Sequence, residues 1–150
     1  MSNNQVSQYQ TIVLAVDLTE ESNQVASRVK QLIAYQDCTV HVVHVIEPLS
    51  FAYGGDVPMD LTSVQEQIQD QARSHLTEFS QQFAAPPEHQ HLIFGRLESE
   101  IHRVAEENAA DLIVVGSHGR HGLALLFGST ANGVLHGAPC DVLAVRVGTS

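Results

Sequence analysis

Short hydrophobic runs alternate with amphipathic segments along the whole chain. Residues 11–16 (TIVLAV), 39–46 (TVHVVHVI) and 111–115 (DLIVV) are nearly continuous apolar runs, rich in β-branched residues and too short for buried helices. Runs of this kind are typical of parallel strands that are covered on both faces. Residues 89–94 and 141–147 predict two further strands, and the first of these is the more polar.

The intervening segments have the hydrophobic spacing of helices. Four helices are predicted, at residues 20–36, 64–83, 97–108 and from about residue 129 onward. Thr19 is the expected N-cap of the first helix, with Glu20 and Glu21 in its first turn, where the helix dipole favours acids. Residues 47–60 contain two prolines and two glycines and predict a long loop.

Strands that alternate with helices predict an α/β fold in a single domain over residues 1–150, with residues 1–8 loosely attached. We expect a doubly wound, five-stranded parallel sheet of order 3-2-1-4-5, with helices on both faces and the polar third strand at an edge. In such a sheet ligands bind beyond the carboxyl ends of the strands, where the order reverses. That crevice lies between strands one and four, and Asp17 and Gly116 border it.

A glycine-rich segment follows the fourth strand. Gly116 and Gly119 allow the backbone to turn sharply and to approach a ligand closely. Gly128, Ser129 and Thr130 then open a helix whose free N–H groups and dipole can hold a phosphate. The alternative is that the first two glycines only form a turn and that Ser129 only caps a helix.

Charge and composition restrict the partners. The chain has 7 Lys+Arg and 17 Asp+Glu, for a formal net charge of -10, so it repels nucleic acid and anionic lipid. It has no long apolar run and no signal-like N-terminus, so we expect no membrane span and a cytoplasmic location. Cys38 and Cys140 have no metal-ligand spacing and are expected to be reduced thiols.

The sequence contains no GxxxxGK[ST] motif, and the turn that begins at Asp17 lacks the glycines of a dinucleotide fingerprint. Among the nine histidines, His41 and His44 are expected on opposite faces of a strand. His89 and His91 are expected to share a face of the edge strand, exposed to solvent. No dedicated metal site is therefore predicted.

Catalysis is not predicted, because Asp17, His118 and Ser129 do not assemble into a nucleophile, a base and an orienting group. We therefore expect no substrate-turnover enzyme and no catalytic residue. His118 and His121 lie in the glycine-rich segment, where they could contact a phosphate or a divalent ion beside it.

Four segments in order resemble the universal stress protein family: IVLAVD (12–17), HVIEP (44–48), the run 116–130 and APCDVLAVR (138–146). The resemblance covers about residues 9–147. It implies a five-stranded subunit that pairs into a homodimer and acts in regulating a stress response. Nucleotide-binding members of the family hold ATP, with or without Mg²⁺, in the crevice described above.

By position, the resemblance implies that Asp17 contacts the ribose or adenine, that Ala15 and Val45 flank the base, and that Gly116 lies against the ribose. It assigns the phosphates to Gly119, Gly128, Ser129 and Thr130. The chain departs from the family's ATP signature, G-x2-G-x9-G-[ST], because only eight residues separate Gly119 from Gly128.

One residue fewer shifts backbone N–H groups by up to about 3.5 Å, and Arg120 could supply compensating charge. Besides an ATP-binding regulator, two readings stay open: a dimeric adaptor without nucleotide binding, and an enzyme that uses the adenylate-handling geometry of the fold.

The last strand predicts how two copies pair. Residues Asp141–Val147 would form an exposed sheet edge, yet this strand is apolar and has no lysine or proline to deter pairing. Antiparallel pairing with a second copy gives a two-fold homodimer with a continuous sheet.

Overall fold

The computed structural model describes residues 9–34, 36–47, 61–118 and 129–148. Five strands form one parallel sheet in the order β3-β2-β1-β4-β5, which confirms the predicted topology. The strands are β1 (Thr11–Ala15), β2 (Thr39–Ile46), β3 (Gln90–Phe94), β4 (Leu112–His118) and β5 (Asp141–Val147). The predictions for residues 1–8 and for the loop at 48–60 lie outside the described residues.

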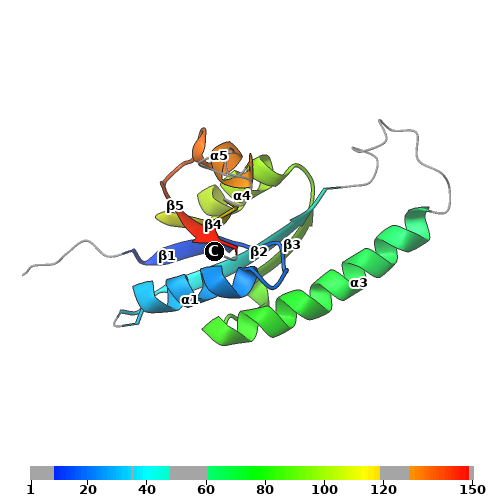
Figure 1. Ribbon diagram of the computed structural model, residues 1–150, viewed down its shortest axis with the longest axis horizontal. Helices are drawn as coiled ribbons and strands as arrows, with labels where there is room; N and C mark the ends of the chain where they lie inside the picture. Colours follow the sequence, from blue (N-terminus) through cyan, green and yellow to red (C-terminus); the bar gives the residue numbers. More distant parts are fainter. Residues whose placement is uncertain (1–8, 35, 48–60, 119–128, 149–150) are drawn as a thin grey trace, which may run out of the picture.

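Helices cover both faces of the sheet, as predicted. On one face lie α1 (Ser22–Leu32) and α3 (Leu61–Ser80), and on the other lie α4 (Leu97–Glu107) and α5 (Ser129–Leu135) (Figure 1). Two short 3-10 helices, η1 (Gln81–Phe83) and η2 (Pro87–His89), connect α3 to β3. None of the helices in the described ranges is both long and apolar enough to cross a membrane.

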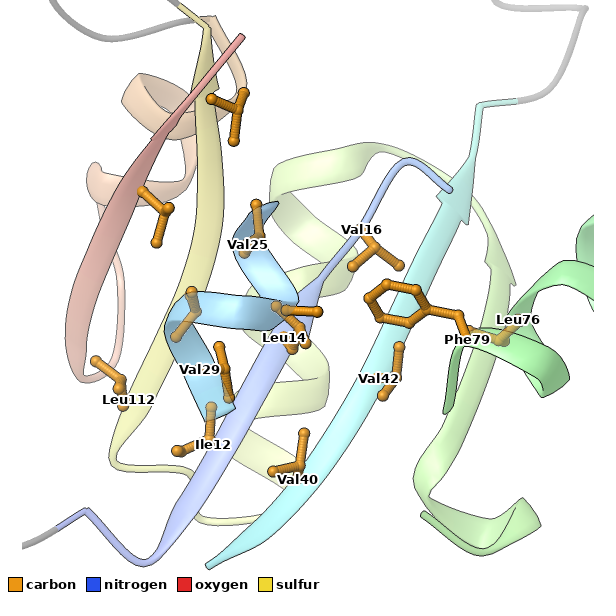
Figure 2. Packing of buried hydrophobic residues seen from close by; sticks show 14 residues of the cluster. Ile12, Leu14, Val16, Val25, Val29, Val40, Val42, Leu76, Phe79 and Leu112 are labelled. Atoms are coloured by element: carbon orange, nitrogen blue, oxygen red, sulfur yellow. The ribbon is translucent and has the colours of Figure 1, made fainter. Parts of the chain in front are cut away.

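β1 is the centre of the sheet and of the core. Ile12 pairs with Val40 on one side and with Leu112 on the other. The side chains of β1 alternate between the two faces of the sheet. Ile12 and Leu14 pack with Leu76 and Phe79 under α1 and α3 (Figure 2), and Val13 packs on the other face under α4. The continuous apolar sequence of β1 therefore reflects burial on both faces.

Several predicted boundaries are wrong; the first helix, for example, ends at Leu32 and not at residue 36. Two of the errors lie at the carboxyl edge of the sheet. α1 starts at Ser22, so Thr19 is not its N-cap and no acid lies in its first turn; Glu21 occupies the cap position without a capping side chain. β4 continues through Gly116 to His118, where the sequence suggested a loop, because these residues pair with Val145–Val147 of β5.

The amino edge of the sheet is held together by side chains. The Asp111 carboxylate accepts hydrogen bonds from the backbone N–H groups of Gln10 and Thr11, at 3.0–3.2 Å. The Tyr9 hydroxyl donates to Asp141 Oδ2 at 2.7 Å. These bonds fix the start of β1 to the starts of β4 and β5.

Candidate functional site

A cavity of about 280 Å³ opens at the carboxyl edge of the sheet. It lies where the strand order reverses, between the end of β1 and the end of β4. Its lining comes from β1, β2, β4, β5, α1 and α4 and consists of Ala15, Val16, Asp17, Glu21, Ser22, Val25, Val43, His44, Val45, Glu47, Leu97, Ile101, Gly116 and Val147. We call it the switch-point cavity.

The inner wall of the cavity is apolar. Ala15 and Val45 come from adjacent strands and pack with the cluster of residues under α4. Leu97 and Ile101, one turn apart on α4, close the same side. Such a surface suits a flat apolar ring, because the transfer of the ring from water to an apolar wall is favourable.

A glycine is needed at position 116 for a packing reason that the sequence did not suggest. It lies within β4, and a Cβ atom at this position would come within 3.3 Å of Val25 Cγ2 and 3.6 Å of Val147 Cγ1. The missing side chain lets α1 pack closely on the sheet beside the cavity. Gly116 therefore lines the site as predicted, but as a packing position in a strand and not as a turn.

Asp17 organises the turn between β1 and α1. Its Oδ1 accepts hydrogen bonds from Thr19 N at 3.0 Å, Thr19 Oγ1 at 2.7 Å and Ser22 Oγ at 2.9 Å. The local side-chain bonds compete with helix formation, which explains why α1 begins later than its hydrophobic pattern suggested. The fixed carboxylate stands at the mouth of the cavity.

His44 and Glu47 complete the polar rim, and neither was predicted. His44 Nδ1 lies 2.8 Å from the Val16 carbonyl oxygen, so this nitrogen donates and Nε2 is the acceptor in the neutral ring. Glu47 Oε2 accepts from Leu97 N at 3.2 Å, at the start of α4. The signal for Glu47 was its position directly after β2, at the edge where ligands bind.

Asp17, Glu21 and Glu47 give the rim three carboxylates, while none of the lining residues is Lys or Arg. Carboxylates accept hydrogen bonds from hydroxyl and amino groups and repel phosphate. The cavity thus has the chemistry for a ring with amino and hydroxyl groups, such as a nucleoside, whereas phosphates would have to lie outside it.

The predicted site residues fall into two groups. Ala15, Asp17, Val45 and Gly116 all line the switch-point cavity. His118 ends β4, and Ser129 and Thr130 begin α5, but their side chains lie outside the described structure. Gly119, Arg120, His121 and Gly128 also lie outside the described residues.

A histidine cluster lies away from this cavity. Its members His89 and His91 were expected to be exposed to solvent, and they are instead partly buried. His41 Nδ1 and His91 Nε2 are 3.0 Å apart, and the rings of His41 and His89 are 4.3 Å apart. His41 is buried, and desolvation, followed by the charges of His89 and His91, lowers its pKa to about 4. In the described ranges, no three His, Cys, Asp or Glu side chains are placed to hold a metal ion.

Known proteins resemble this chain throughout its length. The sequence model of the universal stress protein family matches residues 8–146. Universal stress protein A homolog 1 of Coxiella burnetii is 42% identical over 139 residues, which cover 91% of this chain and 96% of that protein.

Solved structures share the fold. Universal stress protein UspA from Lactobacillus plantarum superposes with a TM-score of 0.71 at 18% identity, covering 94% of this chain and 100% of that one. A universal stress protein in complex with cAMP gives a TM-score of 0.57 at 22% identity, covering 93% and 98%. The family model matches nearly the whole sequence, and the sheet of order 3-2-1-4-5 has helices on both faces. This chain is therefore a member of the universal stress protein family.

Proposed function

We propose that this protein is a homodimeric regulatory module of a stress response that binds an adenine nucleotide, first of all ATP, in the switch-point cavity. The observation that carries the proposal is the cavity's combination of an apolar wall with a rim of three carboxylates. The cavity volume of about 280 Å³ lies just below the range of about 300–1,000 Å³ that is usual for ligand pockets. This volume suits the nucleoside portion of a nucleotide.

In this arrangement Ala15 and Val45 flank the base, and Asp17 accepts a hydrogen bond from the ribose or the base. The phosphates leave the cavity toward residues 119–130, and Mg²⁺ accompanies them when ATP is bound. A family member in complex with cAMP supports an adenine nucleotide as the ligand class. We propose binding and release as the function, without turnover of a substrate.

A dimeric adaptor without nucleotide is the second candidate. Two features favour the adaptor, because neither helps to hold a triphosphate. Only eight residues separate Gly119 from Gly128, and the rim of the cavity is acidic.

Isothermal titration with ATP, with and without Mg²⁺, distinguishes the candidates, with cAMP as a second ligand and GTP as the control for the base. We expect saturable binding of the adenine nucleotides and weaker binding of GTP. If the titration detects no binding of any adenine nucleotide at millimolar concentration, nucleotide binding is ruled out and the adaptor becomes the leading candidate.

The variant Ala15→Leu tests where the nucleotide binds. A larger side chain in the wall overfills the cavity, and overpacking typically costs 1–3 kcal/mol, so we expect affinity to fall by about tenfold. Ala144→Leu is the matched control, because Ala144 is partly buried on the same face of the sheet but does not line the cavity. Equal losses in both variants would place the nucleotide elsewhere.

A further inference from the structure

The histidine cluster joins β2 to β3, the strand at one edge of the sheet. His41 lies in β2, His91 in β3 and His89 in η2, directly before β3. Among the described strands, β3 pairs with β2 alone. His41 stands opposite Val13 and His91 opposite Val43, and both valines belong to the apolar cluster under α4. On the α4 face, the contact between β2 and the start of β3 is therefore made by imidazole rings, next to an apolar core.

The hydrogen bond inside the cluster depends on the protonation state of its rings. His41 Nδ1 and His91 Nε2 lie 3.0 Å apart, so one imidazole donates and the other accepts. A protonated ring has two donors and no acceptor, so two such rings cannot form this bond. The ring centre of His41 lies 4.3 Å from that of His89 and 5.2 Å from that of His91. Positive charges on these rings would therefore repel one another strongly.

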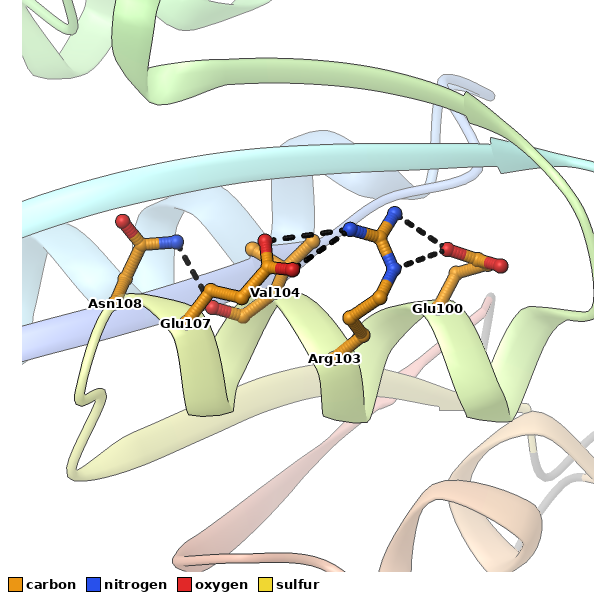
Figure 3. Close-up of polar contacts among 5 residues, drawn as sticks. All are labelled: Glu100, Arg103, Val104, Glu107 and Asn108. Atoms are coloured by element: carbon orange, nitrogen blue, oxygen red, sulfur yellow. Dashed lines mark hydrogen bonds and ion pairs between the residues drawn. The ribbon is translucent and has the colours of Figure 1, made fainter.

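The surroundings of the cluster do not compensate for a positive charge. Burial lowers the pKa of His41 to about 4, and burial also lowers the pKa of His91. Glu107 and Arg103 of α4 act on the pKa of His91 with opposite signs, and they already pair with each other at 3.1 Å (Figure 3). Glu88, the acid of η2, is exposed to solvent. A proton is therefore bound more easily by these rings in water than in the folded cluster.

We propose that the histidine cluster is an acid-sensitive latch, which holds β3 and η2 to β2 and releases them when it takes up protons. Between pH 6.5 and about 4, an opened edge binds a proton at His41 that the closed edge does not bind, so acid shifts the equilibrium toward the open form. Release uncovers the edge of β2, whose backbone groups can then pair with another strand.

β3 is the part of the sheet that gives way because it is held least firmly. It has a neighbouring strand on one side only, and each of its residues is partly exposed. β1, by contrast, has neighbours on both sides and a fully buried centre. Segments with few buried contacts open locally at a lower free energy than the whole fold.

The latch goes beyond nucleotide binding and does not require it. The switch-point cavity opens at the carboxyl edge of the sheet, and none of the three histidines lines it. Nucleotide-free protein is therefore sufficient for the test, and failure of ATP to bind leaves the result unaffected.

The test is hydrogen–deuterium exchange of the backbone amides at about pH 7 and about pH 5, with rates corrected for the intrinsic effect of pH on exchange. We expect the protection of residues 90–94 to fall at least about tenfold between these values, because the opened edge exposes His41 and His91 to protonation. At about pH 5 these amides should also exchange at least about tenfold faster than those of residues 112–116 in β4, which has neighbours on both sides.

Two variants of the cluster identify the cause. Glutamine keeps a side chain that can hydrogen-bond but takes up no proton, so His41→Gln and His91→Gln should each lose most of the acid effect at residues 90–94. The second variant is needed because His41 is buried, and its replacement can impair folding, whereas His91 is partly exposed. His75→Gln is the matched control, since His75 is an exposed histidine of α3, and it should respond to acid like the wild type.

Either of two results would overturn the proposal. Equal protection of β3 and β4 at about pH 5 would mean that β3 opens only when the whole chain unfolds. An acid effect at residues 90–94 that is unchanged in His91→Gln would mean that groups outside the cluster release the strand.

Discussion

The histidine cluster shows how the surroundings of a single residue decide its chemistry. His41 lies in β2 and is 5% exposed, with His91 from β3 and His89 from η2 against it. Burial, followed by the charge of His89, lowers the pKa of His91, while Glu107 and Arg103 of α4 act on that pKa with opposite signs. Burial thus disfavours a proton on His41 and on His91.

Acid should destabilise the protein through His41. Between pH 6.5 and about 4 the unfolded chain takes up a proton at this residue and the folded chain does not, so the stability present above pH 6.5 is lost as the pH falls toward 4. We expect a loss on the order of 2 kcal/mol, measured by urea unfolding across this range. His41→Gln should remove most of the slope.

His136→Gln is the control for this experiment, because His136 is exposed at the end of α5. A slope that is the same in the wild type and in His41→Gln would show that other groups cause the acid sensitivity.

At the scale of elements, one side chain adds a hydrogen bond to the apolar packing of α5 against α4. His102 Nε2 lies 2.7 Å from the Val134 carbonyl oxygen, so the imidazole donates across the two helices. Gly133 lies close by, where a Cβ atom would come within 2.7 Å of Glu98 Cγ. His102 thus helps to hold the two helices in their relative position.

Neighbouring residues of α4 should differ in their effect on stability. His102→Ala leaves the Val134 carbonyl without its partner, and we expect a loss of about 1–2 kcal/mol in unfolding free energy. Arg103→Ala removes exposed ion pairs to Glu100 and Glu107 (Figure 3), which should cost less than about 1 kcal/mol and less still in high salt. Chemical denaturation of both variants measures the difference; the reverse order would contradict this account.

The elements could be predicted from sequence where the signal is local. The buried strands have continuous apolar runs. Their alternation with helices predicted a parallel sheet, and the polar third strand against the apolar first and fourth strands predicted its order. The start of α1 was missed because the Asp17 side chain takes over the local hydrogen bonds, and β4 was cut short because Gly116 was taken for a turn. In both cases a tertiary or side-chain contact outweighs the backbone pattern.

The candidate site was predicted in part for the same reason. Ala15 and Asp17 lie at the end of β1, and Gly116 lies in the last part of β4; the topology brings these two strands together. Glu47 and Leu97 join the site only because the start of α4 returns to the end of β2, a contact that spans fifty residues. His91 was expected to be exposed, since nothing in its own strand reveals its contact with His41.

At the scale of the whole molecule, a few carboxylates join segments that are distant in the chain. Asp111 accepts from Gln10 and Thr11, a hundred residues away, and so links the first and fourth strands at their starts.

Asp111→Ala should therefore destabilise the entire fold. Hydrogen bonds to a charged acceptor contribute about 1.5–3 kcal/mol, and partial exposure reduces this, so we expect a loss of about 2 kcal/mol. Asp111→Asn keeps one acceptor oxygen and should recover part of it. Thermal unfolding of both variants is the measurement, and equal melting temperatures of Asp111→Ala and the wild type would refute the role.

The proposed homodimer makes a prediction about β5. In the sheet, β5 pairs with β4 on one side and forms the edge on the other. Light scattering after size exclusion should give the mass of two chains, and Leu143→Lys in β5 should shift it toward one, because a charge on the edge opposes pairing. Leu135→Lys, at an exposed position of α5, should stay dimeric. If the wild-type protein has the mass of a single chain, the proposed homodimer is wrong.

The central place of β1 has a consequence for how the chain is made. A ribosome releases β1 first, yet one of its two neighbours, β4, is encoded a hundred residues later. Until β4 emerges, one edge of this apolar strand stays unpaired next to the half-built layer of β2 and β3. The nascent chain thus carries an unpaired apolar strand edge through most of translation, and general chaperones have a long opportunity to bind there.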